Sequence, residues 1–472
     1  MKKTKKIASL ILIVITVVAA IAFLTNALLT NTQSEFYVGV TYCGSSAQEA
    51  KQLIDKVKNY TNLFVLQSGT VLQANGITTI NDIGDYAVDS GLHYIIYFGT
   101  DSAWIMQNWL DSYDNRWGSN FLGIYLSDEP GGKMLEGFKG FSDPITGAGF
   151  SKNSGGLITS NINNASVYYS PDGSIKLTVS TPGGGFGDYR DKDYYLNGTV
   201  TVTTYKGKAI SEGERVTEIE SIVAVKDNST LEFTYQELNN SRPFKNDAET
   251  AQLFIDNTKT TLDQYGPRNY TYLTSDYGLY WYDYQSGYDT ILAQFRWNES
   301  ITQDIALARG AAQAFGKDWG AIITWKYDQP PYLPEGEELY QKMCTAYENG
   351  ATYVVVFNYA ANMTGAYGTL SDEHFEALER FWKEEVKNPD VKQGSVKAEA
   401  VFVLPKDFGS GLRSQKDTIW GLWSPTEEQQ QIWLRLQNAL AAYGQKLDVA
   451  YDDSAYLVTG KYSQVIYWNQ TS

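Results

Sequence analysis

The chain has 472 residues, 38 basic and 54 acidic side chains, and a net charge of −16 at neutral pH. This charge argues against nucleic acid or anionic lipid as a partner, because both repel an acidic surface. Two cysteines and two histidines, His93 and His374, argue against a disulfide scaffold, a histidine-rich zinc site and a Ser-His-Asp triad, and no sequence motif suggests a cofactor.

Residues 1–34 predict a membrane segment and stalk. Four lysines within the first six residues precede an apolar run, Ile7–Leu24, and no charge follows until Glu35. The length suits either a cleaved signal peptide or a short membrane span. No small-x-small cleavage site precedes Gln33, which favours a retained anchor. Because the lysines should stay in the cytoplasm, we expect the body at the cell surface, where its nine Asn-x-Ser/Thr sequons could carry glycans.

Residues 35–140 and 247–387 predict a (β/α)8 TIM barrel, because eight apolar strands alternate with helical patterns. The strands expected in chain order are Phe36–Thr41, Leu63–Gln67, Tyr94–Phe98, Phe121–Leu126, Tyr270–Thr274, Thr290–Phe295, Ala321–Trp325 and Tyr353–Phe357. The helices expected between them are Ala47–Lys58, Ile80–Ser90, Ala103–Tyr113, Glu249–Tyr265, Ile301–Phe315, Gly336–Asn349 and Asp372–Val386.

Residues 141–246 break this alternation. The segment is rich in Gly, Asn, Ser and Thr and contains short strand patterns and a strong turn at 171–173. We expect a small β-sandwich-like unit inserted after the fourth barrel strand, on the face where TIM-barrel enzymes carry their sites. A lid, a sugar-binding module and mere decoration all remain open.

Residues 396–472 follow a polar linker and predict a C-terminal α/β domain of the doubly wound, flavodoxin-like type. An amphipathic helix is expected at Thr426–Tyr443. One apolar strand precedes it, at Ala398–Leu404, and two follow it, at Leu447–Tyr451 and Val465–Trp468. The first strand is not followed by a glycine-rich phosphate loop, so a structural role is expected.

The fourth strand ends in the most informative motif, Ser127-Asp128-Glu129-Pro130-Gly131-Gly132. Pro130 favours an extended Glu129, and the glycines allow a sharp turn. Adjacent carboxylates repel one another, so one of the two should have a raised pKa. The alternative is an ordinary acidic helix N-terminus.

Other strand ends supply side chains that could bind a sugar. Carboxylates, an amide and aromatic rings should meet at one rim of the barrel, and surplus Tyr and Trp suit stacking on sugar rings. The residues expected to bind substrate are Asp276, Trp281, Trp297, Trp325, Tyr327, Asp328 and Asn358.

The barrel resembles the (β/α)8 glycoside hydrolases, and the appended α/β domain is similar to that of family 42-like β-galactosidases. Glu129 matches the position of the acid/base at strand four in that superfamily. The expected Asn-Glu pair is replaced here by Asp128-Glu129, and strand seven carries Trp325-Lys326-Tyr327-Asp328 where a glutamate nucleophile is expected.

The Asp-Glu pair resembles that of the substrate-assisted N-acetylhexosaminidases, which need no protein nucleophile. The resemblance implies that Asp128 orients the substrate's acetamido group, that Glu129 protonates the leaving oxygen, and that Trp325 and Tyr327 form walls of the pocket.

The sequence therefore predicts an extracellular glycoside hydrolase tethered to the membrane and acting on a glycan. The first alternative is a non-catalytic carbohydrate-binding or cell-surface structural protein on a degenerate barrel. Another carboxylate-driven lyase or hydrolase is a further possibility.

Overall fold

The computed structural model describes the barrel region and the C-terminal unit almost throughout. The described residues are 35–99, 103–135, 246–264, 270–296, 300–359, 365–388, 390–422, 424–456 and 459–470, with the backbone of seven strands between 164 and 234. The predicted membrane segment at 1–34 and Trp297 lie outside them. No helix within the described residues is long and apolar enough to cross a membrane.

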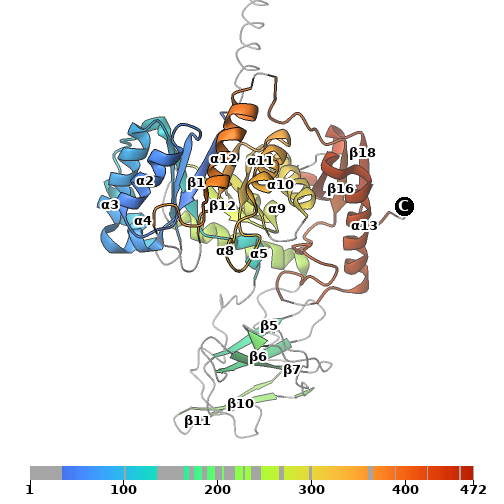
Figure 1. Cartoon of the computed structure of the whole chain (residues 1–472). Helices are drawn as coiled ribbons and strands as arrows, with labels where there is room; N and C mark the ends of the chain where they lie inside the picture. Colours follow the sequence, from blue (N-terminus) through green and yellow to red (C-terminus); the bar gives the residue numbers. More distant parts are fainter. Residues whose placement is uncertain are drawn as a thin grey trace, which may run out of the picture.

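Eight parallel strands close into a barrel, as the sequence predicts (Figure 1). Around the barrel the order is β1 (Tyr37–Tyr42), β15 (Tyr353–Val356), β14 (Asp318–Ile323), β13 (Thr290–Phe295), β12 (Tyr272–Asp276), β4 (Phe121–Leu126), β3 (His93–Phe98) and β2 (Leu63–Leu66). The ring is closed by β1 and β15, where Tyr37 pairs with Tyr353. The strand bounds differ from expectation most in β12, which is shifted by two residues and ends at Asp276, and in β14, which begins three residues early and ends two residues early.

Helices cover the outside of the barrel. They are α2 (Ala47–Val57), α3 (Gly69–Asp89), α4 (Ala103–Ser112), α8 (Asp247–Asp263), α10 (Ile301–Phe315), α11 (Gly336–Glu348) and α12 (Asp372–Phe381, followed by a π-helical turn at Trp382–Val386). Ser46, Ser68 and Ser300 cap three of them by accepting a backbone N–H with the side chain. The Ser68 cap explains why α3 begins at Gly69, well before the predicted Ile80.

Two short helices are additional to the elements expected from the sequence, although the alternative interpretation of Asp128-Glu129 as a helix N-terminus agrees with the start of the first. They are α5 (Pro130–Lys133) and α9 (Tyr280–Ser286), which directly follow β4 and β12. Each begins after a residue in the left-handed conformation, Glu129 at φ 59° and Leu279 at φ 49°. Helices of one or two turns are too short for apolar periodicity to reveal them.

The interior of the barrel is a packed apolar core. Its fully buried members come from alternate positions of the strands: Leu63, Val65, Ile95, Tyr125, Leu273, Leu292, Ile322 and Val355. A filled interior leaves no pore, so ligands have access to the ends of the barrel.

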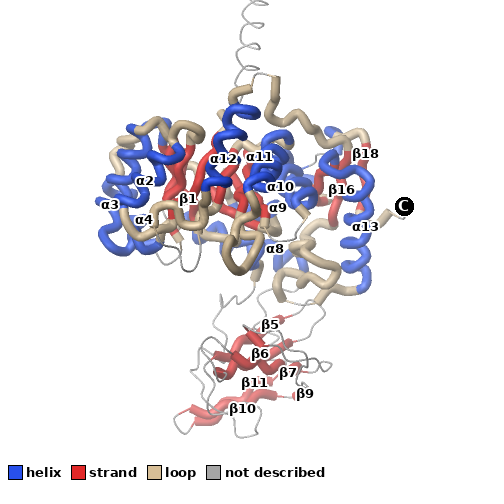
Figure 2. Tube along the Cα trace, viewed as in Figure 1, coloured by secondary structure: helices blue, strands red, loops and turns tan. Residues whose placement is uncertain are grey.

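Two sheets form from the residues inserted after β4 (Figure 2). One contains β5 (Asn164–Tyr169), β6 (Ile175–Pro182), β7 (Tyr189–Leu196), β8 (Tyr205–Lys206) and β9 (Glu218–Ile219); the other pairs β10 (Ser221–Lys226) with β11 (Ser229–Thr234). The sequence pattern does not indicate β7, because charged residues interrupt the row of aromatic residues in this strand. That the two sheets pack as a sandwich stays a prediction.

The C-terminal unit is a small parallel sheet with one long helix. The sheet has the order β17 (Leu447–Tyr451), β16 (Ala400–Leu404), β18 (Gln464–Tyr467), and the helix is α13 (Glu427–Tyr443). Its elements lie where the sequence places them, to within two residues. The finer assignment to a flavodoxin-like domain stays a prediction.

Candidate functional site

The Asp128-Glu129 pair lies in a strained turn at the carboxyl end of β4. Ser127 and Glu129 both adopt left-handed backbone conformations, with φ of 61° and 59°. Such conformations are unfavourable for residues with a side chain and persist where the surroundings impose them. The Glu129 N–H donates to the carbonyl of Ser275 at 3.0 Å, which ties the turn to β12. The prediction that Glu129 has an extended backbone is therefore wrong, because tertiary contacts override the preference that a following proline imposes.

Both carboxyl groups line a cavity of about 300 Å³ at the carboxyl ends of the strands. This is the end of the barrel at which the sequence predicts a site, and the volume falls in the range of small-molecule pockets. The lining residues are Gln67, Tyr125, Asp128, Glu129, Ser275, Gln294, Arg296, Ile322, Thr324, Trp325, Phe357 and Tyr359.

Asp128 is the more enclosed of the two carboxyl groups. Its Oδ1 accepts hydrogen bonds from the Tyr125 hydroxyl at 2.8 Å and the Ser275 hydroxyl at 3.1 Å. Burial, and then the negative charge of Glu129, raise the pKa of Asp128 above its usual value. A raised pKa within the pair is what the sequence predicts. Because Oδ1 already accepts two bonds, a proton on Asp128 belongs on Oδ2.

Glu129 has surroundings that suit a negative charge. Gln294 Nε2 donates to its Oε1 at 3.0 Å, and Lys133 Nζ lies 3.5 Å from its Oε2. Gln294 also donates to Ser275 Oγ at 3.0 Å, so one amide links the two carboxyl groups through Ser275. Donors to a carboxylate stabilise its charged form. The carboxyl group with the raised pKa is thus Asp128, whereas the resemblance implies that the proton donor is Glu129.

An aromatic wall forms another part of the cavity. Trp325 and Tyr359 stack with ring centroids 5.8 Å apart and planes 6° apart, and Phe357 lies 6.0 Å from Tyr359. The Trp325 indole N–H donates to the Tyr359 carbonyl, which fixes the indole. A flat, preorganised aromatic surface beside carboxyl groups suits the apolar face of a sugar ring.

A cation–π contact borders the carboxyl groups. Arg296, which lines the cavity, lies 3.6 Å from the centre of the Tyr277 ring. Arg413 of the C-terminal unit lies 5.6 Å from the same centre. The C-terminal unit therefore reaches to within one side chain of the cavity, which the sequence did not indicate.

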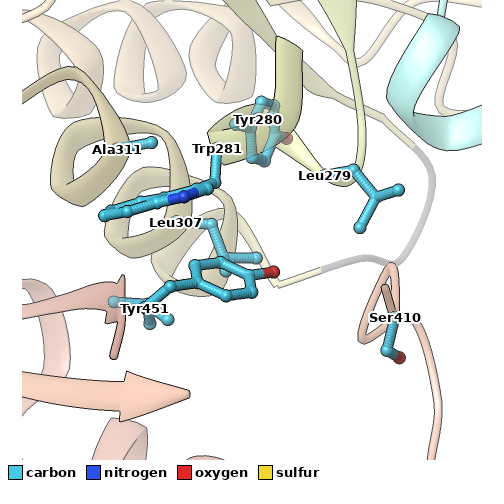
Figure 3. Close-up of a pocket in the computed structure, with 8 residues that line it drawn as sticks. Leu279, Tyr280, Trp281, Leu307, Ala311, Ser410 and Tyr451 are labelled. Atoms are coloured by element: carbon cyan, nitrogen blue, oxygen red, sulfur yellow. The ribbon is translucent and has the colours of Figure 1, made fainter. Parts of the chain in front are cut away.

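Two residues expected in the site lie elsewhere. Asp276 is fully buried and accepts the backbone N–H groups of Gly131 and Gly132 at 2.5 and 2.6 Å, so it holds α5 and does not line the cavity. Trp281 lies on α9 in the core, against Tyr451 of β17. Figure 3 shows Trp281 among the residues that line a small void. The volume of this void is about 10 Å³, which is far too small for a sugar. Trp281 is buried because it lies on α9, and Asp276 is buried because it accepts the amides at the start of α5.

The remaining expected residues have mixed positions. Trp325 lines the cavity. Tyr327 and Asp328 are exposed beyond it, and Asn358 is buried, where its Oδ1 accepts bonds from Thr369 at 2.9 and 3.1 Å. Trp297 lies outside the described residues.

Several lining residues were missed in the sequence, chiefly Tyr125, Ser275 and Gln294. A signal for Gln294 was available, because it is a buried polar residue in an otherwise apolar strand. Ser275 gives a similar but weaker signal. Tyr125 looks like an ordinary core residue until its hydroxyl partner is known.

The chemistry open to the site follows from its polar groups. Among the described lining residues the carboxyl groups are Asp128 and Glu129, so no third carboxylate faces them there. Among the described residues no group of three or more His, Cys, Asp and Glu is placed to hold a metal ion. The pair can therefore offer one proton and one negative charge beside an aromatic wall.

No family model and no curated protein sequence matches the chain. Two solved structures to which the chain is similar are GH5_18 from Streptomyces cattleya, in complex with Manb1-4GlcNAc, and pyruvate kinase from Pyrobaculum aerophilum. The first has 8% identity and a TM-score of 0.43, over 92% of this chain and 99% of that one. The second has 10% identity and a TM-score of 0.30, over 89% and 97%. With similarities this distant, function has to be argued from the site itself.

Proposed function

We propose that the protein is a glycoside hydrolase whose catalytic groups are Asp128 and Glu129. The observation that carries this proposal is the cavity at the strand ends, where two adjacent carboxyl groups with different surroundings lie together with a stacked Trp325–Tyr359 pair. Glycoside hydrolysis needs one proton donor and one group that balances the positive charge at the anomeric carbon.

Asp128 is the proton donor in this proposal. Burial and the neighbouring Glu129 raise its pKa, which favours the protonated form more than in an exposed carboxyl group, and its Oδ2 is the oxygen left to carry that proton. Glu129 is the second carboxyl group in this proposal, and Gln294 and Lys133 lie beside its two oxygens. This exchanges the two roles that the sequence resemblance implies.

The proposed substrate is a glycan containing 2-acetamido sugars. Since no third carboxylate lines the described part of the cavity, a substrate-assisted mechanism fits better than a protein nucleophile. The acetamido oxygen would attack the anomeric carbon as the glycosidic bond breaks, and the Asp128 proton would pass to the leaving oxygen. Glu129 would accept the acetamido N–H, and water activated by Asp128 would then open the cyclic intermediate.

Two variants assayed with two leaving groups test this assignment. Asp128→Asn should lose about 10²- to 10⁴-fold in turnover of chitooligosaccharides, whose leaving groups need a proton. The same variant should keep most of its kcat/KM for a dinitrophenyl N-acetylglucosaminide, because cleavage of that bond needs no proton, whereas kcat should fall because Asp128 no longer activates the water. Glu129→Gln should lose activity on both substrates.

The matched control is Asp111→Asn, a change at an exposed residue of α4 that does not line the cavity. It should behave as the unmodified protein does on both substrates. Wild-type turnover of chitooligosaccharides by Asp128→Asn would exclude Asp128 as the acid.

A non-catalytic carbohydrate-binding protein is the second candidate function. The absence of a third carboxylate among the described lining residues favours it as well. Binding of chitooligosaccharides without hydrolysis, weakened by Trp325→Ala, would support this function and overturn the catalytic one.

The proposed location is the cell surface, with residues 1–34 as the membrane anchor. The support is the sequence pattern of four lysines before an apolar run. Protease added to intact cells should release a soluble fragment that begins between about residues 28 and 35. Protection of the body in intact cells would contradict this orientation.

A further inference from the structure

A buried pair of carboxyl groups lies against the α5 turn. Asp276 ends β12, Asp283 lies on α9, and both side chains have an exposed fraction of 0%. A Cβ placed on Gly131 would lie 3.0 Å from Asp276 Oδ2 and 2.8 Å from Asp283 Oδ2. The first turn of α5 therefore rests directly on both carboxyl groups.

Asp276 acts as an acceptor for the backbone. Its Oδ2 accepts the Gly131 N–H, and its Oδ1 accepts those of Gly132, Tyr277 and Gly278, at distances from 2.5 to 3.3 Å. Several N–H donors stabilise a carboxylate and compensate for its burial. These bonds join α5 to the loop after β12, and Glu129 immediately precedes α5.

Asp283 has no such compensation. Neither of its oxygens has a hydrogen-bond partner outside the pair among the described residues. An unpaired buried carboxylate would cost several kcal/mol, so the group avoids ionising. Burial, and then the charge of Asp276, raise the pKa of Asp283 well above its usual range. Its proton therefore bridges to Asp276.

We propose that Asp276 and Asp283 share one proton and act together as a positioning unit for the Asp128-Glu129 turn. Asp283 stays neutral, which lets Asp276 hold the α5 amides as an anion. The catalytic consequence rests on the function proposed above, whereas the structural role does not.

Other titratable groups around the pair leave this arrangement intact. Tyr277, Tyr284 and Tyr288 interact with the pair and are neutral near pH 7, because burial raises the pKa of each. Glu129 and Lys133 flank α5 and pair with each other. Arg413 donates to the Gly132 carbonyl at 3.3 Å and is paired with Asp417.

The pair makes folding stability depend on pH. Burial raises the pKa of both carboxyl groups, so the folded pair keeps its shared proton, whereas both groups should titrate near 3.9 in the unfolded chain. Above about pH 4 the folded protein therefore holds a proton that the unfolded chain has released, so stability falls as pH rises.

The first experiment measures the free energy of unfolding of the full-length protein from pH 5 to 8. Asp283→Asn removes one titrating group but keeps a donor to Asp276. The dependence of stability on pH should decrease by one proton across this range relative to the unmodified protein. An unchanged dependence would show that Asp283 ionises normally and would overturn the proposal.

The second experiment measures hydrogen exchange in the peptide that contains Gly131 and Gly132. Asp283→Leu removes the hydrogen-bond donor that residue 283 offers to Asp276. Protection of the Gly131–Gly132 peptide against exchange should then fall at least tenfold. Asp283→Asn should restore protection, and the peptide covering β13 should exchange equally in all three proteins. Full protection in Asp283→Leu would overturn the positioning role.

The third measurement is kinetic and uses the chitooligosaccharide assay. Asp283→Leu should lower kcat by an order of magnitude or more with a smaller change in KM, and Asp283→Asn should recover most of kcat. If no form of the protein hydrolyses a glycan, the proposed function is wrong. The stability and exchange results still test whether Asp276 and Asp283 share a proton and position the turn.

Discussion

Arg309 shows at the residue scale how the barrel and the C-terminal unit are joined. Its guanidinium, on α10, is almost fully buried and donates to Asp448 Oδ1 at 2.7 Å and Asn349 Oδ1 at 2.6 Å. It also donates to the carbonyls of Gln445 and Leu447. Burial raises the pKa of Asp448, and the adjacent Arg309 charge opposes that effect. The burial of each charged group, Arg309 and Asp448, is thus stabilised by the opposite charge of the other.

Arg309→Ala should destabilise the protein by about 3–5 kcal/mol, because it leaves the buried Asp448 carboxylate without its counter-charge. The measurement is chemical denaturation followed by tryptophan fluorescence. Lys446→Ala is the control, since it breaks the exposed Lys446–Glu399 pair and should cost less than about 1 kcal/mol. Equal effects of the two changes would show that Asp448 is compensated by other groups.

At the scale of elements, helix α10 and strand β17 come into unusually close contact. Gly310 lies in the middle of α10, where a Cβ would lie 2.1 Å from the carbonyl oxygen of Val449 on β17. No side chain fits there without a shift of the backbone. A glycine inside a helix is unfavourable by itself, so the close packing of helix on strand explains its presence.

Gly310→Ala should therefore destabilise the protein by about 1–3 kcal/mol, although the same change in a free helix is stabilising. Gly69→Ala is the matched control, because a Cβ at the first residue of α3 meets nothing within 4 Å. That change should be neutral or stabilise by up to about 1 kcal/mol. Thermal unfolding of the two variants measures whether each change raises or lowers the stability. Stabilisation by Gly310→Ala would disprove the close contact.

At the scale of the whole molecule, the C-terminal unit covers an aromatic face of the barrel. Trp281 packs against Tyr451 at 5.1 Å, Phe315 against Tyr456 at 4.2 Å, and Tyr282 against Trp420 at 4.8 Å. These contacts resemble the inside of one domain more than a hinge between two, because the rings involved are large and mostly buried.

A chain that ends at residue 395 should therefore fail to fold as a soluble barrel. Loss of the C-terminal unit would expose the apolar surface of α8, α9 and α10, which favours aggregation. Expression of this truncated form beside the full chain, followed by size-exclusion chromatography, checks the prediction. A monomeric truncated form with the original melting temperature would show that the two parts are independent domains.

The sequence by itself determined the barrel, the position of the C-terminal sheet and the end of the barrel that carries the Asp128-Glu129 pair. Apolar strands of regular spacing leave few architectures open, and parallel strands present their carboxyl ends on one face. Trp325 was also found in this way, because it follows a strand. These features depend on local pattern and on topology, which a single sequence contains.

Only the tertiary structure decided which residues at the rim meet in the cavity and which groups surround each carboxyl group. Asp276, Trp281 and Asn358 have the same residue types as true site residues, yet α9 and the loop around Thr369 turn them into the interior. The environments of Asp128 and Glu129 depend on Ser275 and Gln294, which lie about 150 residues away in the chain. Burial and charge act through space, so the pKa of Asp128 depends on the tertiary structure around it.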